Sequence, residues 1–259
     1  MRNMEVSDFL DYLGTEESNL LASLINLNQD LGLFQELDQI YRERLSVEQE
    51  KLDEYIIAML YRYAHSQLCF SMSAFLRCHS KEAFSATRTA IDAGLAAYKI
   101  LEEPGSEDRY LKGEREFVFI KRNIQQAREK DASKYPKAAP LIDFHEWCSK
   151  YASHADADVV VMHTEIVEDL KAGKKELKLH YFDIRRRKVE GQYFLIFLLG
   201  IYFHIFQVFR IFLDQKLPDR DRELDGRVGR LGEELKKRHA EYDRLNRRNS
   251  DATDELKTL

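Results

Sequence analysis

Two short stretches of the chain carry polar residues whose types and spacing could do chemistry. Arg88 and Asp92 lie four apart in a stretch where Ala or Gly recurs every three or four residues, and Ser149 and His154 lie in the run 147–154. A guanidinium presents a planar fork of donors to carboxylates or phosphates, and an imidazole titrates near neutral pH. These four residues are the candidate catalytic site. Asp92 would neutralise the charge of Arg88 when no ligand is bound, and Ser149 would orient His154.

The same residues also suit a structural role. A charge on a small-residue helix needs a partner, and Arg88 and Asp92 can pair across one helical turn. A buried polar network of this kind would fix the register of packed helices without binding anything. This structural alternative stays open at the level of the sequence.

A second candidate site is the basic stretch 171–188, which has 8 basic and 2 acidic side chains and includes Tyr181 and Phe182. Lysine and arginine near aromatic rings are typical of surfaces that contact a nucleic-acid backbone. Lysines on a strand edge also discourage aggregation, which is the alternative. The candidate nucleic-acid-binding residues are Lys171, Lys174, Lys175, Lys178, Arg185, Arg186 and Arg187.

Metal and cofactor motifs give weaker signals. Histidines and carboxylates are dense between 145 and 165, but they lack the four-residue spacing that organises ligands on a helix: His145, His154, Asp156, Asp158, His163 and Glu165. The chain has no GxGxxG, GxxxxGK[ST], HExxH or GxSxG sequence. We therefore predict no metal site and no cofactor.

The elements that must position these residues are mainly helical. With 11 Gly and 4 Pro in 259 residues and 33% charged residues, the composition favours a helical bundle with a charged exterior. Apolar residues at three- and four-residue steps predict a helix over 16–44, after a short helix over 7–13 that Gly14 ends. Ser46 and Gln49 form a capping box for a third helix through 77. Its predicted buried face is Leu52, Ile56, Met59, Tyr63 and Phe70.

The helix that carries Arg88 and Asp92 is expected at the centre of the bundle. Ser80 is its predicted N-cap, and the helix covers 81–101. Its small residues let neighbouring backbones approach closely: Ala83, Ala86, Ala90, Ala93, Gly94 and Ala97. Helices are also expected near 117–130 and over 141–152, which contains Ser149.

The spacing of apolar residues changes in the second half of the chain. Alternating residues predict strands over 159–168 and 175–182, and one candidate register sets His163 opposite His180. The apolar stretch 193–213 is long enough to cross a bilayer, but polar residues interrupt its second half, which favours a buried core helix over a membrane anchor. We divide the chain into a bundle domain, 1–217, with a hairpin near 159–182, and a C-terminal helix, 218–259.

The C-terminal helix could mediate association. Apolar residues fit heptad positions over 221–245, with Arg238 interrupting, so a homodimer through this segment is one expected partner interaction. Residues 1–60 carry 13 acidic and 4 basic side chains, which repels polyanions from that section. The 3 cysteines form no CxxC pair, and no signal peptide precedes the first helix, so we expect a cytoplasmic protein.

The Arg-x-x-x-acid pair on a small-residue helix, followed by a Ser-rich helix end that closes in His154, resembles uncharacterised bacterial helical bundles, which in turn look like the HEPN superfamily. The resemblance covers roughly 50–213. It implies a nucleic-acid-associated bundle in a bacterial defence or toxin–antitoxin context. Catalytic members use an Arg and a His four to six residues later on one helix, whereas here Lys150 is the base nearest before His154.

The resulting prediction is a mainly α, multi-helix bundle with one inserted β-hairpin and a protruding C-terminal helix. We expect it to bind RNA or a protein partner, without standard ribonuclease activity; any activity would be that of a metal-independent ribonuclease. The alternatives are an interaction protein that dimerises through its C-terminal helix and a protein attached to a membrane by a single span.

Overall fold

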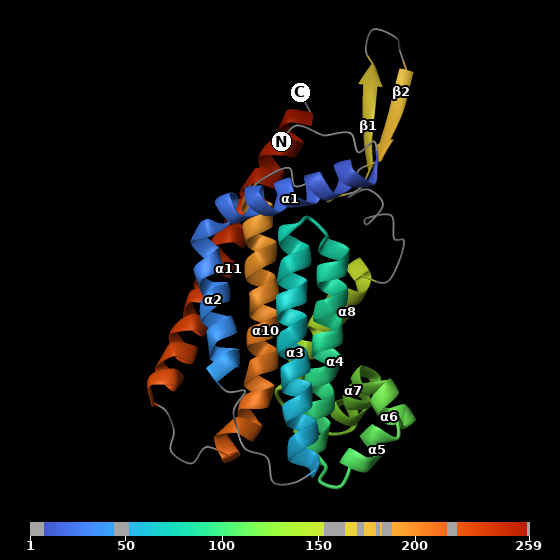
Figure 1. Ribbon diagram of the computed structural model, residues 1–259, viewed down its shortest axis with the longest axis vertical. Helices are drawn as coiled ribbons and strands as arrows, with labels where there is room; N and C mark the ends of the chain where they lie inside the picture. Colours follow the sequence, from blue (N-terminus) through green and yellow to red (C-terminus); the bar gives the residue numbers. More distant parts are fainter. Residues whose placement is uncertain are drawn as a thin grey trace.

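Long helices run side by side along one axis of the molecule (Figure 1). The computed structural model describes residues 8–43, 52–152, 164–169, 174–179, 182, 188–216 and 222–257. The mainly helical bundle predicted from the sequence is confirmed. Its long central elements are α3 (Leu52–Leu76), α4 (Ser80–Glu102), α8 (Ala138–Ala152) and α10 (Lys188–Lys216).

The central position predicted for the small-residue helix is confirmed. α4 packs against α3, α8 and α10, and all six of its small residues are buried. A Cβ on Gly94 would lie 3.4 Å from Cγ2 of Ile205, so α4 and α10 approach closely there. Ser80 is the first residue of α4 and not its N-cap; the cap position belongs to His79, which makes no side-chain capping bond.

The first two helices divide at a different residue from the one predicted. α1 (Phe9–Asn26) runs straight through Gly14, and the break falls at Leu27, before α2 (Asn28–Glu43). A glycine inside a helix costs about 1 kcal/mol, which the rest of an 18-residue helix can offset. Leu27 is buried where α1, lying across the end of the bundle, turns into α2 (Figure 1).

Of the buried face predicted for α3, Ile56 is buried, the prediction is wrong at three residues, and the side chain of Leu52 lies outside those described. Met59, Tyr63 and Phe70 are 63%, 47% and 57% exposed. Apolar residues occur on opposite sides of α3, so periodicity alone could not select the face that meets α4. The residues that are buried include Ile57, Leu60, Ala64, Leu68 and Phe75. The predicted capping box at Ser46 and Gln49 lies outside the described residues.

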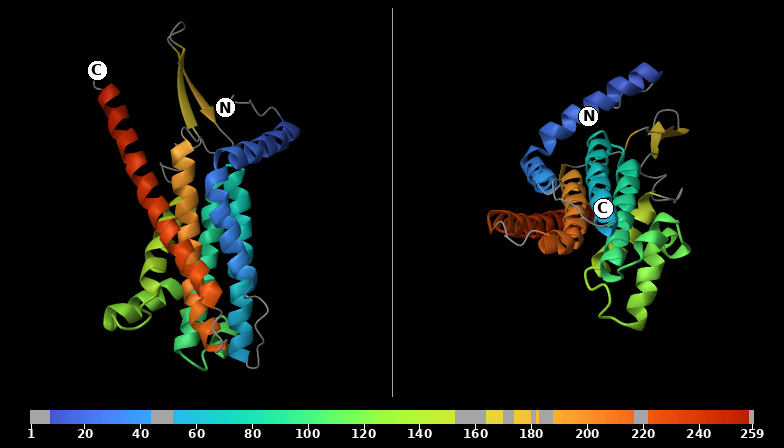
Figure 2. Two further views of the ribbon diagram at one scale, coloured as in Figure 1. Left: turned by 90° about the vertical axis from the view of Figure 1, so that its left-hand side faces the viewer. Right: turned by 60° about the horizontal axis from the view of Figure 1, so that its bottom comes forward.

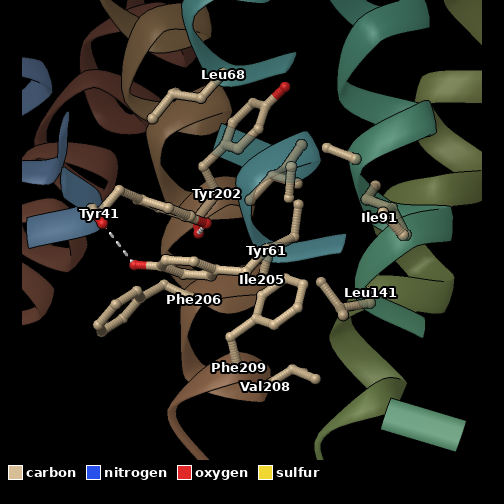
Figure 3. Close-up of a cluster of buried hydrophobic side chains, with 14 of the residues drawn as sticks. Tyr41, Tyr61, Leu68, Ile91, Leu141, Tyr202, Ile205, Phe206, Val208 and Phe209 are labelled. Carbon is tan, nitrogen blue, oxygen red and sulfur yellow. Dashed lines mark hydrogen bonds between the residues drawn. The ribbon is translucent and has the colours of Figure 1, made fainter. Parts of the chain in front are cut away.

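Aromatic side chains form the centre of the core, between α2, α3 and α10 (Figure 3). The Tyr61 hydroxyl donates to the backbone oxygen of Tyr41 over 2.9 Å, and the Tyr41 hydroxyl donates to the backbone oxygen of Tyr202 over 2.8 Å. These bonds satisfy the buried hydroxyls of Tyr41 and Tyr61, which would be costly to leave unpaired.

Three short helices lie near the C-terminal end of α4 (Figure 1), and the last of them packs against it: α5 (Glu107–Leu111), α6 (Arg115–Val118) and α7 (Ile120–Lys130). The buried ammonium of Lys99 contacts Glu103 over 2.7 Å, and the Tyr135 hydroxyl donates to the other Glu103 oxygen. Burial alone would raise the pKa of Glu103, but the bonds from Lys99 and Tyr135 outweigh it and lower that pKa.

Two strands stand at the same end of the bundle as α1 (Figure 1). β1 (Thr164–Asp169) and β2 (Lys174–Leu179) pair antiparallel, with Ile166 opposite Leu177. The connecting residues 170–173 lie outside the described part of the chain, so the predicted hairpin stays a prediction. His163 and His180 also lie outside it.

α10 is the one helix of the described ranges that is long and apolar enough to cross a membrane. Of its apolar window, 56% is buried inside the bundle. It packs against α2, α3, α4, α8 and α11, so its apolar side chains have protein neighbours on several sides. The core helix of a bundle meets the same length and composition criteria as a membrane span.

The C-terminal helix α11 (Arg222–Lys257) lies along α10 and α2, and its far end extends beyond the bundle (Figure 2). Its predicted heptad residues are buried within the same chain except Leu245, which is 37% exposed; the buried ones are Leu224, Val228, Leu231, Leu235 and Tyr242. A homodimer through 221–245 stays a prediction, and it would need another face of α11. The division between 217 and 218 likewise stays a prediction.

α11 is fixed to the bundle by a buried polar group that we call the Asp30 network: Asp30, Gln192, Arg238 and Tyr242. Asp30 on α2 is fully buried, and the Tyr242 hydroxyl lies 3.0 and 2.9 Å from its two carboxylate oxygens. Gln192 on α10 donates to Asp30 over 3.2 Å, and Arg238 reaches within 3.9 Å. Three helices therefore meet at one carboxylate.

Candidate functional site

Two pairs of polar residues converge where α4 packs against α8. Arg88 and Asp92 lie one turn apart on α4, and His145 and Ser149 lie one turn apart on α8, so each pair projects from one side of its helix. We call these four residues the Arg88–His145 cluster. The small residues of α4 bring the two helices close enough for the side chains to meet.

The His145 ring is the centre of the cluster. Its Nε2 lies 3.3 Å from Arg88 Nε and also 3.3 Å from Oδ1 of Asp92. On the other side, the Ser149 hydroxyl lies 3.4 Å from His145 Nδ1 and donates to the His145 backbone oxygen over 2.8 Å. Both ring nitrogens therefore have protein neighbours.

The two neighbours of Nε2 require opposite states of that nitrogen. Nε2 accepts a hydrogen bond from the Arg88 guanidinium only when it carries no proton, and it donates to the Asp92 carboxylate only when it carries one. The proton on Nε2 therefore determines whether the ring bonds to the cation or to the anion. Arg88 and Asp92 cannot both bond to the ring at once.

The cluster is only partly closed to solvent. The His145 side chain is 10% exposed, whereas that of Asp92 is 41% exposed. Within the described ranges, Arg88 donates through Nε alone, so its two terminal nitrogens retain their donor capacity. A half-buried guanidinium with unused donors can bind a phosphate or carboxylate through its fork.

Cys148, beside Ser149 on α8, is inert at this site. Burial raises the pKa of its thiol to about 12, although the nearby Arg88 acts in the opposite direction. A buried thiol with so high a pKa is not a nucleophile at neutral pH. The chemistry of the cluster therefore belongs to its guanidinium, imidazole, carboxylate and hydroxyl groups.

The structure brings together three of the four residues predicted as the catalytic site: Arg88, Asp92 and Ser149. The histidine that they meet is His145, and the predicted His154 lies outside the described residues. The signal that was missed is the four-residue spacing of His145 and Ser149 inside a predicted helix. Of the 145–165 metal candidates, His154, Asp156, Asp158 and His163 also lie outside the described residues.

The predicted nucleic-acid-binding lysines of β2 have acidic partners in the strand register. Lys174, Lys175 and Lys178 stand opposite Asp169, Glu168 and Glu165 of β1. Lys171 and the arginines Arg185, Arg186 and Arg187 lie outside the described ranges, so the basic surface stays a prediction.

A second cluster, missed by the sequence analysis, lies between α2 and α3. Asp38 Oδ1 is 2.7 Å from His65 Nε2 and 3.8 Å from Cys69 Sγ, and Asp38 Oδ2 is 2.8 Å from Arg42 Nε. Burial would raise the pKa of Asp38, but bonds from Arg42 and His65 lower it below its ordinary value. Burial, reinforced by Asp38, raises the pKa of the Cys69 thiol.

A cavity of about 410 Å³ lies apart from both clusters, on α6 and α7. Its lining combines two arginines, two amides, a carboxylate and a phenyl ring: Arg115, Glu116, Phe119, Arg122, Asn123 and Gln126. No residue of the Arg88–His145 cluster lines it.

Comparison of the chain with protein-family models, with curated proteins and with solved structures finds no match.

Proposed function

We propose that this protein binds RNA, and that the Arg88–His145 cluster holds one of the RNA phosphates. The observation that carries the proposal is the guanidinium of Arg88, whose terminal nitrogens have no acceptor in the described part of the chain. A guanidinium with unused terminal nitrogens is best suited to bind a phosphate through two parallel hydrogen bonds. The resemblance to HEPN bundles favours RNA as the class of nucleic acid.

The geometry supports binding better than cleavage. A general base must come within hydrogen-bonding distance of the proton that it removes, here that of a ribose 2′-hydroxyl. His145 is 10% exposed, and its two nitrogens already face Arg88, Asp92 and Ser149. We therefore propose that His145 positions Arg88 and that the protein leaves the RNA intact.

Asp92 gives the proposal a specific consequence. Its carboxylate is 41% exposed beside the guanidinium, where it repels an incoming phosphate. Asp92→Asn should therefore strengthen RNA binding by a few fold at low ionic strength, because the repulsion is removed while the side-chain shape is kept. If the cluster served only to hold the helices together, the same change would leave RNA binding unaltered.

The direct experiment is fluorescence anisotropy with a labelled single-stranded RNA in low salt. Arg88→Ala should weaken binding about 10-fold, the value of one hydrogen-bonded charge pair. Arg244→Ala, which removes an exposed arginine from α11, is the matched control and should leave the affinity within two-fold, about the scatter expected for a distant site. Equal affinities for Arg88→Ala and the control would remove the proposal.

A cleavage assay separates binding from catalysis. The same RNA should remain full length after prolonged incubation with the wild-type protein. If the RNA is cut, and His145→Ala stops the cutting while binding persists, the cluster is a ribonuclease site. The defence or toxin–antitoxin setting rests on the HEPN resemblance and stays part of the proposal.

A further inference from the structure

The cluster between α2 and α3 contains three different metal-ligating groups. Asp38, His65 and Cys69 each offer one ligand atom, and these atoms all lie within 4.8 Å of one another. We infer that they form a binding site for Zn²⁺, with a water molecule as the fourth ligand. This inference is independent of RNA binding, since it concerns other residues on other helices.

The donor set matches the chemistry of zinc. Zn²⁺ binds thiolate, imidazole and carboxylate groups tetrahedrally at about 2.0 to 2.3 Å, so its ligand atoms lie about 3.3 to 3.8 Å apart. The 3.8 Å between Cys69 Sγ and Asp38 Oδ1 already fits. The 2.7 Å between Asp38 Oδ1 and His65 Nε2 is a hydrogen bond, and the ion would take the place of its proton.

The fold holds each ligand in position. His65 and Cys69 lie one turn apart on α3, and Asp38 approaches them from α2. Arg42 binds Oδ2 of Asp38, which leaves Oδ1 for the ion. The ring of Tyr41 stacks on His65 at 5.4 Å between centroids and limits its rotation. Such supporting contacts are what orients the ligands of protein metal sites.

The exposure of the site fits an ion with one open position. The side chains of His65 and Asp38 are 9% and 22% exposed, and Cys69 is partly exposed. The three side chains are therefore not fully closed to solvent, which would supply the water ligand. On binding, the Cys69 thiol releases its proton to solvent and the sulfur bonds to zinc. The proton between His65 Nε2 and Asp38 moves through solvent to Nδ1, so the neutral ring binds zinc through Nε2.

The alternative is a polar group that only joins α2 to α3. Titration of the metal-free, full-length protein with Co²⁺ separates the two, because a cobalt–thiolate bond gives a charge-transfer absorption band. One equivalent of Co²⁺ should produce the band and tetrahedral visible absorption, and one equivalent of Zn²⁺ should displace it. Absence of the band in folded wild-type protein overturns the inference.

Matched variants assign the ligands. Cys69→Ser should abolish the band, whereas Cys148→Ser, at a buried thiol on another helix, should keep it. Asp38→Asn keeps an oxygen for His65 but loses the charge, and it should weaken Zn²⁺ at least 10- to 100-fold, the loss seen even for outer supporting residues. A band that persists in Cys69→Ser overturns the assignment, and Arg88→Ala should leave the titration unchanged.

Discussion

The Asp30 network and the Arg88–His145 cluster are both polar groups between packed helices, yet they differ in how fully their bonds are used. Asp30 is fully buried and receives donors from Tyr242 and Gln192, with Arg238 close by. Arg88 is half-buried and uses one of its nitrogens in the described part of the chain. A saturated, closed network holds helices together, whereas an open group with unused donors can bind a ligand.

The largest expected effect is the removal of the buried carboxylate. Asp30→Ala removes the acceptor of the Tyr242 hydroxyl and one of the two acceptors of the Gln192 amide, and it should lower the free energy of unfolding by about 3 kcal/mol. Urea denaturation measures the change. Glu233→Ala, at an exposed residue of α11, should change stability by less than about 0.5 kcal/mol. A loss at Asp30 that is no greater than the control would mean that the network does not hold α11.

Two glycines of α11, substituted one at a time, test how tightly α11 packs against α10. A Cβ on Gly232 would lie 2.7 Å from Cζ of Phe203, whereas a Cβ on Gly229 meets nothing within 4 Å. Gly232→Ala should destabilise the protein by about 1 kcal/mol, and Gly229→Ala should stabilise it by up to about 1 kcal/mol through helix propensity. Thermal unfolding of both variants measures the difference. Equal shifts for the two would show that Phe203 moves aside without cost.

The open cluster should respond in the opposite way to the closed network. Arg88→Ala should lower the free energy of unfolding by less than about 1 kcal/mol, because the guanidinium is half-exposed and its one bond is 3.3 Å long. The same variant should lose RNA affinity, as described above. Urea denaturation beside the anisotropy measurement shows both effects. A stability loss as large as that of Asp30→Ala would place Arg88 with the structural residues.

Glu103 is intermediate between the Asp30 network and the Arg88–His145 cluster, because it is half-exposed but paired with the buried Lys99. Its pKa in the folded protein is lowered, so the pairing stabilises the fold above the ordinary pKa of about 4.5 and is lost as pH falls through the folded value. The melting temperature of Glu103→Gln should therefore lie below that of the wild type at neutral pH and approach it in acid. A difference that is constant with pH would contradict this.

The residues of the candidate site were predictable to different degrees. Arg88 and Asp92 are conspicuous because charges on a small-residue helix must find partners. The identity of their histidine was not predictable, because it depends on how α8 is rotated against α4, and no pattern within either helix records that rotation. The position of Asp38 beside His65 and Cys69 was equally unpredictable from the sequence, although His65 and Cys69 already show a four-residue ligand spacing.

The same limit explains the errors in the fold. Apolar residues on both sides of α3 left the buried face undetermined until α4 and α10 were in place. Gly14 is typical of a helix end, but α1 has enough good helix formers to continue through it. The central position of α4 was predictable because small residues along one stripe have few other uses in a bundle.

The contacts between α11 and α2 have a consequence for the order of events during synthesis. Arg227 pairs with Glu36 and Glu43, and Tyr242 bonds to Asp30, across sequence separations of 191, 184 and 212 residues. These contacts can form only after the chain through α11 has left the ribosome, and closing such long loops slows folding. The N-terminal helices should therefore emerge first, and Asp30 should remain exposed to water until α11 packs against α2.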